Sequence, residues 1–314
     1  MRYFIQFLRS DMFYKQPGFK HPTLIGLSAI LMWSATVGIF RSVSEIFGPT
    51  AGAALIFSAG GFFACLMTGL PNLKTFPRPY LWIGGSLFVL YEVMLALSIG
   101  LATDRVQAIE LGMINYLWPS LTILFAVIAG QQRGSWLLIP SMALCFVGII
   151  WVMKGDSSWS LVGLWGNIQS NPWAYGMAFC AAITWALYSV FTRRFGQGAN
   201  GVPLFLVVTA MVLWIKYVFG VEAPIAFNAA GVTEVLVMGL LMATAYSSWN
   251  YSIQHGNITV LATISYFTPV LSVLLASFWL NINPGMSFLT GVGLVTLGSL
   301  LSGWVSTLPE KSPA

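Results

Sequence analysis

Charged side chains are scarce in this chain. Lysine, arginine, aspartate and glutamate together make up 7% of the 314 residues, whereas hydrophobic residues make up 57%. The mean hydropathy is +0.81. A soluble domain of this length needs far more charge on its surface. The composition therefore excludes a soluble protein and indicates a polytopic membrane protein.

Residues that carry metal or nucleophile chemistry are also scarce. Histidine occurs only as His21 and His255, and cysteine only as Cys65, Cys145 and Cys180. The three cysteines fall within apolar runs, which favours small core residues over a disulfide framework or a metal site. The sequence contains no HExxH, GxSxG or P-loop motif, the patterns that such enzymes need. We therefore expect no metal, no cofactor and no enzymatic activity.

The few cations are scattered rather than clustered. The net charge of +5 comes from 14 lysines and arginines that form no stripe, so we expect no nucleic acid partner. Loop cations of membrane proteins collect on the cytoplasmic side. With the N-terminus inside, the cytoplasmic segments hold Arg2, Arg9, Lys15, Lys20, Lys74, Arg78, Arg133, Arg193, Arg194 and Lys311. The opposite side holds Arg41, Arg105, Lys154 and Lys216. This asymmetry predicts that both termini are cytoplasmic.

Long apolar runs are abundant. A membrane-spanning helix needs about 20 mostly apolar residues. Such runs occur at 23–41, 50–70, 80–101, 107–129, 135–153, 173–193, 203–220, 233–254, 258–280 and 286–306. In the polar stretch that follows the fifth run, Asn171 and Pro172 predict a helix cap and a first-turn proline. Near the N-terminus, aromatic residues alternate with cations, which predicts a segment in the headgroup plane.

Two phrases recur about 150 residues apart. NYLWPSLTILFA at Asn115–Ala126 corresponds to SYFTPVLSVLLA at Ser265–Ala276. AILMWSATVGIFR at Ala29–Arg41 corresponds to AAITWALYSVFTR at Ala181–Arg193. The repeat unit covers five predicted helices and occurs twice. Because five crossings bring the chain to the opposite face, the second copy must be inverted relative to the first.

The predicted fold class is therefore all-α, a polytopic membrane protein with ten transmembrane helices as two inverted five-helix repeats around a central cavity. Residues 1–22 are expected to form a cytoplasmic or interfacial N-terminal segment, and 23–153 the first repeat. Residues 154–172 are the expected extracytoplasmic linker, 173–306 the second repeat and 307–314 a cytoplasmic tail.

Each copy of one repeated phrase contains a proline, Pro119 in the first and Pro269 in the second. A proline in a helix interior removes the hydrogen bond to the carbonyl four residues back, which here belongs to Asn115 and Ser265. A freed carbonyl at mid-membrane is tolerated only where it is buried in protein or lines water. We predict that both prolines are hinges beside a substrate site with Asn115 in contact with the substrate; a purely structural kink is the alternative.

Aromatic residues occur near the middle of several predicted spans, although tryptophan and tyrosine normally collect at the membrane interfaces. These residues are Trp33, Tyr91, Tyr116, Trp118, Trp185, Tyr246 and Tyr266. Their polar tips need partners at that depth, so the rings are expected to face inward and wall a cavity; simple core packing is the alternative. Glu92 is the one carboxylate deep inside a predicted span. It is expected to carry protons, to meet a substrate ammonium, or to bond to a neighbouring helix.

The chain resembles the drug/metabolite transporter superfamily, specifically its ten-helix EamA-type members. YEVMLALSIGLA and INYLWPSLTILFA, the five-plus-five repeat and the paired WPS and TP helices carry the resemblance. It implies export of amino acids across the bacterial inner membrane by alternating access. It also implies a central cavity lined by Trp33, Tyr116, Trp118 and Trp185, together with Tyr91, Glu92, Tyr246 and Tyr266. Many relatives carry a Gly-Glu pair after the ninth span, where this chain has Leu280-Asn281-Ile282-Asn283.

The sequence thus predicts a secondary transporter that exports neutral amino acids, with aromatic ones preferred. Membrane lipid is its other expected partner, and a monomer is the expected state. A proton-coupled exporter of cationic drugs or other small metabolites, in which Glu92 is indispensable, is the alternative of the same class. A passive channel is a third alternative. A membrane-embedded lipid enzyme is disfavoured because the sequence lacks a catalytic cluster.

Overall fold

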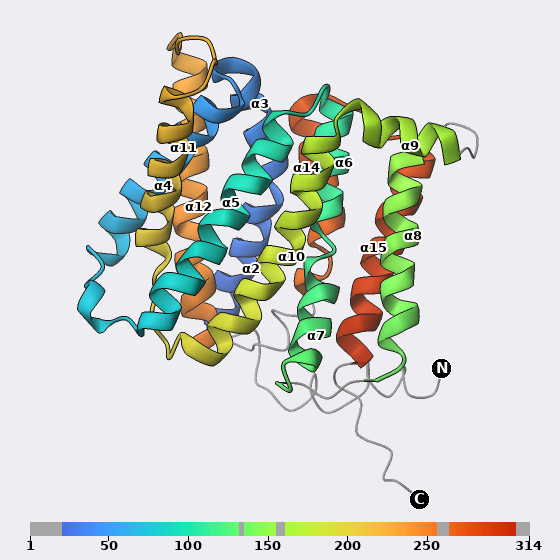
Figure 1. The fold of residues 1–314 in the computed structure, drawn as a ribbon, viewed down its shortest axis with the longest axis horizontal. Helices are drawn as coiled ribbons and strands as arrows, with labels where there is room; N and C mark the ends of the chain where they lie inside the picture. Colours follow the sequence, from blue (N-terminus) through green and yellow to red (C-terminus); the bar gives the residue numbers. More distant parts are fainter. Residues whose placement is uncertain (1–20, 132–134, 155–160, 256–263, 306–314) are drawn as a thin grey trace, which may run out of the picture.

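The computed structural model describes residues 21–131, 135–154, 161–255 and 264–305 (Figure 1). Within these residues the chain is helical and has no strand. The predicted headgroup-plane segment before His21 and the predicted cytoplasmic tail lie outside the described part of the chain.

The described helices fall into two length classes. Those long and apolar enough to cross a membrane are Pro22–Phe47, Pro49–Thr68, Tyr80–Gly100, Arg105–Ile128, Pro172–Phe195, Ala229–Trp249 and Met286–Trp304. Shorter apolar helices are Leu138–Lys154, Val202–Val218 and Thr268–Leu280. Each of these segments overlaps one of the apolar runs predicted from the sequence.

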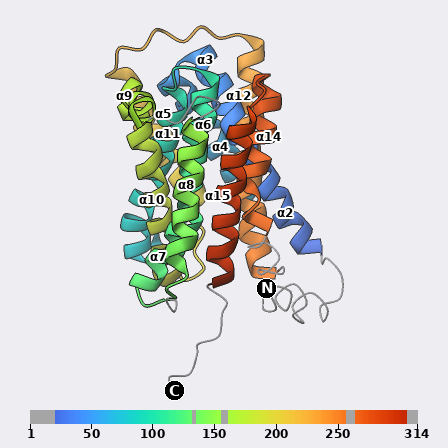
Figure 2. The same cartoon turned by 90° about the vertical axis from the view of Figure 1, so that its right-hand side faces the viewer.

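In chain order the α-helices are α2 (His21–Ser34), α3 (Thr36–Phe47), α4 (Pro49–Thr68), α5 (Gly85–Gly100), α6 (Arg105–Asn115), α7 (Trp118–Ile128), α8 (Leu138–Lys154), α9 (Leu161–Ser170), α10 (Pro172–Phe195), α11 (Val202–Val218), α12 (Ala229–His255), α14 (Thr268–Leu280) and α15 (Met286–Val305). A π turn at Tyr80–Gly84 leads into α5. Apart from α9, the helices run along one bundle between two ends (Figures 1 and 2). The upper end is where α3 finishes and α6 starts, and the lower end is where α2 starts and α15 finishes.

The first span is longer than the predicted 23–41. α2 and α3 continue to Phe47, with a break at Ala35. The predicted end assumes that Arg41 lies in a loop. In the structure the Arg41 guanidinium is buried, donates to the carbonyl oxygen of Ala102 at 2.6 Å and pairs with Glu45 at 2.9 Å. A cation with such partners is tolerated in an apolar bundle, so the helix continues past it.

The predicted polar linker contains a further helix, α9, which lies across the upper end of the bundle beside α8 (Figure 1). The predicted cap of the next helix is confirmed. The Asn171 side-chain oxygen accepts a hydrogen bond from the backbone nitrogen of Ala174 at 3.3 Å, and Pro172 is in the first turn.

Small residues bring helices α8 and α15 into close contact. A Cβ added at Gly291 would lie 2.6 Å from the Gly148 carbonyl oxygen, and one at Gly298 would lie 2.8 Å from the Cys145 backbone nitrogen. Such short separations require glycine, because any Cβ would clash with the facing helix. In lipid the hydrophobic effect does not hold helices together, and close packing of backbones contributes instead. Elsewhere α4 packs against α11 and α12, α10 packs against α5, and α12 packs against α2.

Candidate functional site

A cavity of about 220 Å³ lies inside the bundle. Its lining residues come from α2, α3, α5, α6, α7, α10, α12 and the start of α14, so both halves of the chain contribute. The volume is below the roughly 300–1,000 Å³ typical of sites for drug-sized ligands. A smaller metabolite fits it better.

Every predicted substrate-binding residue except Tyr266 lines this cavity: Trp33, Tyr91, Glu92, Asn115, Tyr116, Trp118, Trp185 and Tyr246. The expectation that the mid-span rings of these residues face inward is therefore met. The wall is completed by Thr36, Val37, Leu95, Gly112, Ser189, Met242, Trp249, Ser265 and Thr268.

Tyr266 does not line the cavity, which corrects the prediction. Its ring lies against Gly303 on α15, where an added Cβ would collide with the Tyr266 ring and hydroxyl. The equivalent position in the first repeat, 150 residues earlier, holds Met153 rather than glycine. Tyr116, the counterpart of Tyr266, lines the cavity instead. The two halves therefore place equivalent tyrosines differently, and Tyr266 occupies the space that Gly303 leaves.

Two indoles, equivalent in the repeat, each gather other rings around the cavity. The centroid of the Trp185 ring lies 4.5 Å from that of Tyr91 and 6.4 Å from that of Trp118. The centroid of the Trp33 ring lies 5.4 Å from that of Tyr246 and 5.3 Å from that of Trp249. Tilted and edge-on arrangements of this kind stabilise aromatic clusters. Both clusters present ring surface to whatever occupies the cavity.

Trp249 was not among the predicted site residues. It lies one turn after Tyr246 on α12, and residues three apart share a helix face. Ser189 likewise follows Trp185 by one turn on α10. Helical spacing from the predicted aromatic residues could therefore have found both positions.

The two helices with internal prolines are broken just before the proline, as predicted. In the first repeat, α6 ends at Asn115 and α7 begins at Trp118, and the Leu117 nitrogen bonds to the Ile114 carbonyl oxygen at 3.1 Å. In the second, the Phe267 nitrogen bonds to the Ile264 carbonyl oxygen at 2.9 Å, and α14 begins at the next residue. Both breaks adjoin the cavity, through Asn115 and Ser265 respectively.

The polar groups at the two breaks differ. The Ser265 carbonyl oxygen accepts a hydrogen bond from the Thr268 hydroxyl at 2.5 Å. The residue that corresponds to Thr268 in the first repeat is Trp118, which has no hydroxyl. Asn115 is only 6% exposed, and its oxygen Oδ1 has no hydrogen-bond partner among the residues that the structure describes. An acceptor buried in this way costs about 1–3 kcal/mol. The first break therefore holds an acceptor that a bound ligand can use.

Glu92 is buried and lines the cavity, and it bonds to a neighbouring helix. The Tyr246 hydroxyl on α12 donates to Glu92 Oε1 on α5 at 2.5 Å. Of the alternatives expected for Glu92, the bond to a neighbouring helix is therefore present. The same residue lines the cavity, so a ligand in the cavity lies within its reach.

Two curated proteins that are similar to this chain are named as amino acid exporters. Over 285 residues the chain is 42% identical to the aromatic amino acid exporter YddG of Salmonella typhimurium (strain 14028s / SGSC 2262) and to that of Escherichia coli (strain K12). Each alignment covers 91% of this chain and 97% of the relative. A solved crystal structure matches with a TM-score of 0.66 at 23% identity, over 92% of this chain and 98% of the other, which supports the fold alone.

A model of the EamA-like transporter family matches residues 172–304, which include α10 to α15. The identity to the two exporters extends the similarity over nearly the whole length. Together these findings show that the chain belongs to the EamA-like transporter family.

Proposed function

We propose that this protein is a secondary transporter that exports neutral amino acids, with aromatic ones preferred, across the bacterial inner membrane. The observation that carries the proposal is the cavity, which combines aromatic walls with the unpartnered oxygen of Asn115. The names of the two exporters that share 42% identity with the chain support the same substrate class.

The cavity offers a partner for each part of an amino acid zwitterion. The rings around Trp33 and Trp185 stack on the side chain of the substrate. Asn115 Oδ1 accepts a hydrogen bond from the ammonium group. Helices α7 and α14 begin at Trp118 and Thr268, both in the cavity wall, and the positive ends of their dipoles favour the carboxylate.

The proposed topology is ten transmembrane helices in two inverted repeats, at 23–153 and 173–306, joined by the linker 154–172. Reciprocal helix contacts support it. In this topology α10 corresponds to α2 and α3, α12 to α5, and α14 to α6 and α7. Accordingly, the contact of α10 with α5 is matched by that of α2 and α3 with α12. The contact of α10 with α6 and α7 is matched by that of α2 and α3 with α14. Two helices pack directly against their counterpart in the other repeat: α4 against α11, and α8 against α15. A pseudo-two-fold axis in the membrane plane relates such pairs.

The lower end of the bundle is the proposed cytoplasmic side, which follows from the cation asymmetry of the loops. Alternating access then requires that the two halves rock about the cavity. The helix breaks before Pro119 and Pro269 are the proposed bending points, because each lacks the regular hydrogen bond to the preceding turn.

Transport by the purified protein in liposomes tests the proposal. We expect saturable counterflow of labelled phenylalanine or tryptophan, competed by other aromatic amino acids. Trp118→Ala and Tyr116→Ala should each lower it about two- to tenfold, since each removes a ring from the cavity wall. Trp82→Ala is the matched control, because Trp82 is 71% exposed and outside the cavity. Unchanged transport in both cavity variants would refute the assignment.

A second candidate function is proton-coupled export of cationic drugs or other small metabolites. The position of Glu92 in the cavity wall favours it, because a carboxylate there can pair with a cation or carry a proton. It requires that Glu92 be indispensable for transport.

A further inference from the structure

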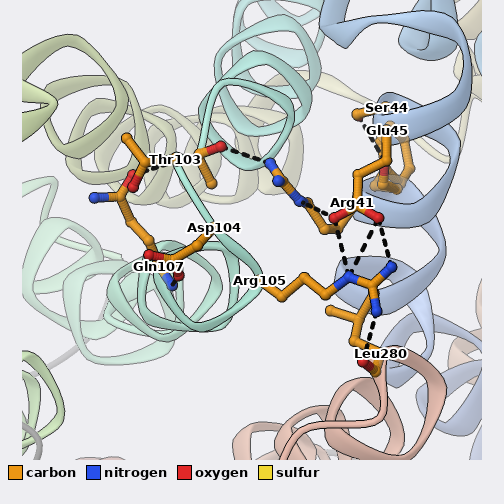
Figure 3. Close-up of polar contacts among 10 residues, drawn as sticks. Arg41, Ser44, Glu45, Thr103, Asp104, Arg105, Gln107 and Leu280 are labelled. Atoms are coloured by element: carbon orange, nitrogen blue, oxygen red, sulfur yellow. Dashed lines mark hydrogen bonds and ion pairs between the residues drawn. The ribbon is translucent and has the colours of Figure 1, made fainter.

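Three helices meet at the upper end of the bundle through two charged side chains and one backbone carbonyl (Figure 3). Glu45 is in the last turn of α3, Arg105 is the first residue of α6, and Leu280 is the last residue of α14. Arg105 Nη2 lies 2.7 Å from Glu45 Oε2, and Arg105 Nε lies 3.1 Å from Glu45 Oε1. Arg105 Nη1 donates to the Leu280 carbonyl oxygen at 2.9 Å. One guanidinium therefore ties α6 to both α3 and α14.

A second arginine supports the same carboxylate. Arg41 is one turn before Glu45 on α3, and its Nε lies 2.9 Å from Glu45 Oε1. Arg41 Nη1 donates to the carbonyl oxygen of Ala102, in the segment between α5 and α6. We call the group of Arg41, Glu45, Arg105 and the Leu280 carbonyl the upper latch.

The upper latch lies above the cavity on helices that also form the cavity wall. α3 contributes Val37, α6 contributes Gly112 and α14 contributes Thr268 to that wall. At 1.5 Å per residue, Glu45 is about 12 Å further along α3 than Val37, and Arg105 is about 10 Å from Gly112 along α6. The latch therefore joins three of the cavity-lining helices at a level between the cavity and the upper end.

Below the latch, α3 touches α6 and α14 closely. A Cβ added at Gly112 would lie 2.7 Å from Val37 Cγ2, and one added at Gly38 would lie 3.1 Å from the Ala276 Cα. These contacts leave no room for a substrate between α3 and either neighbour. In this structure α3 is therefore closed against both α6 and α14, first by direct helix contact and then, further up, by the latch.

We propose that the upper latch is the gate on the extracytoplasmic side, which must part for substrate to leave there. The proposal rests on the proposed transport function and adds the residues that control one of its two openings. The same three helices would then move apart at their upper ends, while their lower parts still line the site.

The charges of the latch suit repeated opening. Arg41 and Glu45 are on one helix, so Glu45 keeps a partner when α6 moves away. The Arg105 side chain is 47% exposed and can turn into water. Opening therefore leaves no unpaired charge buried, which would be costly. Ion pairs that are partly exposed contribute little each, so the latch biases the closed state without fixing it.

Access of a thiol reagent to the cavity tests the gate directly. The background carries Cys65→Ser, Cys145→Ser and Cys180→Ser, and Ser189→Cys places one reporter in the cavity wall on α10, outside the latch helices. Cells that express each variant are treated from outside with a membrane-impermeant maleimide. Glu45→Gln and Arg105→Gln should raise the labelling rate about two- to fivefold.

Matched variants keep the test specific. Arg193→Gln removes an exposed cation from the lower end and should leave the labelling rate unchanged. Arg105→Lys keeps the charge but loses the fork that reaches Glu45 and Leu280 together, so it should give an intermediate rise even if a glutamine variant does not fold. Unchanged labelling in all three latch variants, or an equal rise in Arg193→Gln, would overturn the proposal.

The labelling assay needs no substrate, so it separates the gate from the transport function. Counterflow that fails in the parent protein while latch variants still label faster would count against amino acid transport alone. Intact counterflow with unchanged labelling would count against the latch alone.

Discussion

Asn115→Leu is expected to abolish most transport without weakening the fold. Leucine has nearly the shape of asparagine but no polar atoms. The substitution removes the buried oxygen Oδ1 that has no partner in the structure and that we assign to the substrate ammonium. Stability and function should therefore change in different directions, which an ordinary damaging substitution does not produce.

The magnitude follows from the surroundings of Asn115. Removing a buried unsatisfied acceptor recovers about 1–3 kcal/mol. The Asn115 amide also interacts with the Tyr91 hydroxyl, and the loss of one neutral hydrogen bond costs about 0.5–1.5 kcal/mol. The free energy of unfolding should thus lie between about 0.5 kcal/mol below and about 2.5 kcal/mol above that of the parent. A hydrogen bond to a charged ammonium contributes about 1.5–3 kcal/mol, so apparent substrate affinity should fall roughly 10- to 150-fold.

Two measurements on the same preparation check this expectation. Thermal unfolding in detergent reports stability, and the half-saturation concentration in tryptophan counterflow reports affinity. Ser277→Ala is the matched control, since Ser277 Oγ on α14 is also buried without a partner but lies outside the cavity. It should stabilise the protein and leave the half-saturation concentration unchanged.

Either of two results would refute the reasoning. If the Asn115→Leu protein keeps its half-saturation concentration, this side chain does not meet the ammonium group. If the Asn115→Leu protein unfolds at a clearly lower temperature than the parent, the Asn115 oxygen stabilises the fold, although it has no partner in the structure.

Two further substitutions test the coupling mechanism and the helix packing. Glu92→Gln should keep normal counterflow at two pH values, because a glutamine oxygen still accepts the Tyr246 hydroxyl; loss of transport would instead favour the proton-coupled drug exporter. Gly298→Ala should lower the free energy of unfolding by about 1–3 kcal/mol, because its Cβ would lie 2.5 Å from Cys145 Sγ and overpacking strains the core. Gly293→Ala, on the same helix with open space around it, is the control and should leave the melting temperature unchanged.

Hydropathy alone located the apolar segments of the bundle, because a helix that crosses lipid must be apolar along its own length. The predicted end of a helix was wrong where a charged residue pairs with a group distant in the sequence. Arg41 was expected to end the first span, yet its bond to Ala102, 61 residues away, lets α3 continue. No property of the residues near Arg41 in the sequence encodes that partner.

The candidate site divides in the same way. The depth of each aromatic residue in its span could be read from the sequence, and most of these rings line the cavity. The sequence did not distinguish the two equivalent tyrosines, yet Tyr116 lines the cavity and Tyr266 lies against Gly303 on α15. Composition and local pattern specify what each helix is able to bury.

Only the tertiary structure decided which groups meet at the upper latch. Arg105 joins Glu45 and Leu280, which are 60 and 175 residues away in the chain. The sequence placed Arg105 near a helix end but offered no means to pair it, because hydropathy and helical periodicity describe neighbours within a segment. Contacts between segments depend on how the helices pack, and in this protein both the close contacts of α3 with α6 and α14 and the unpartnered Asn115 oxygen arise from that packing.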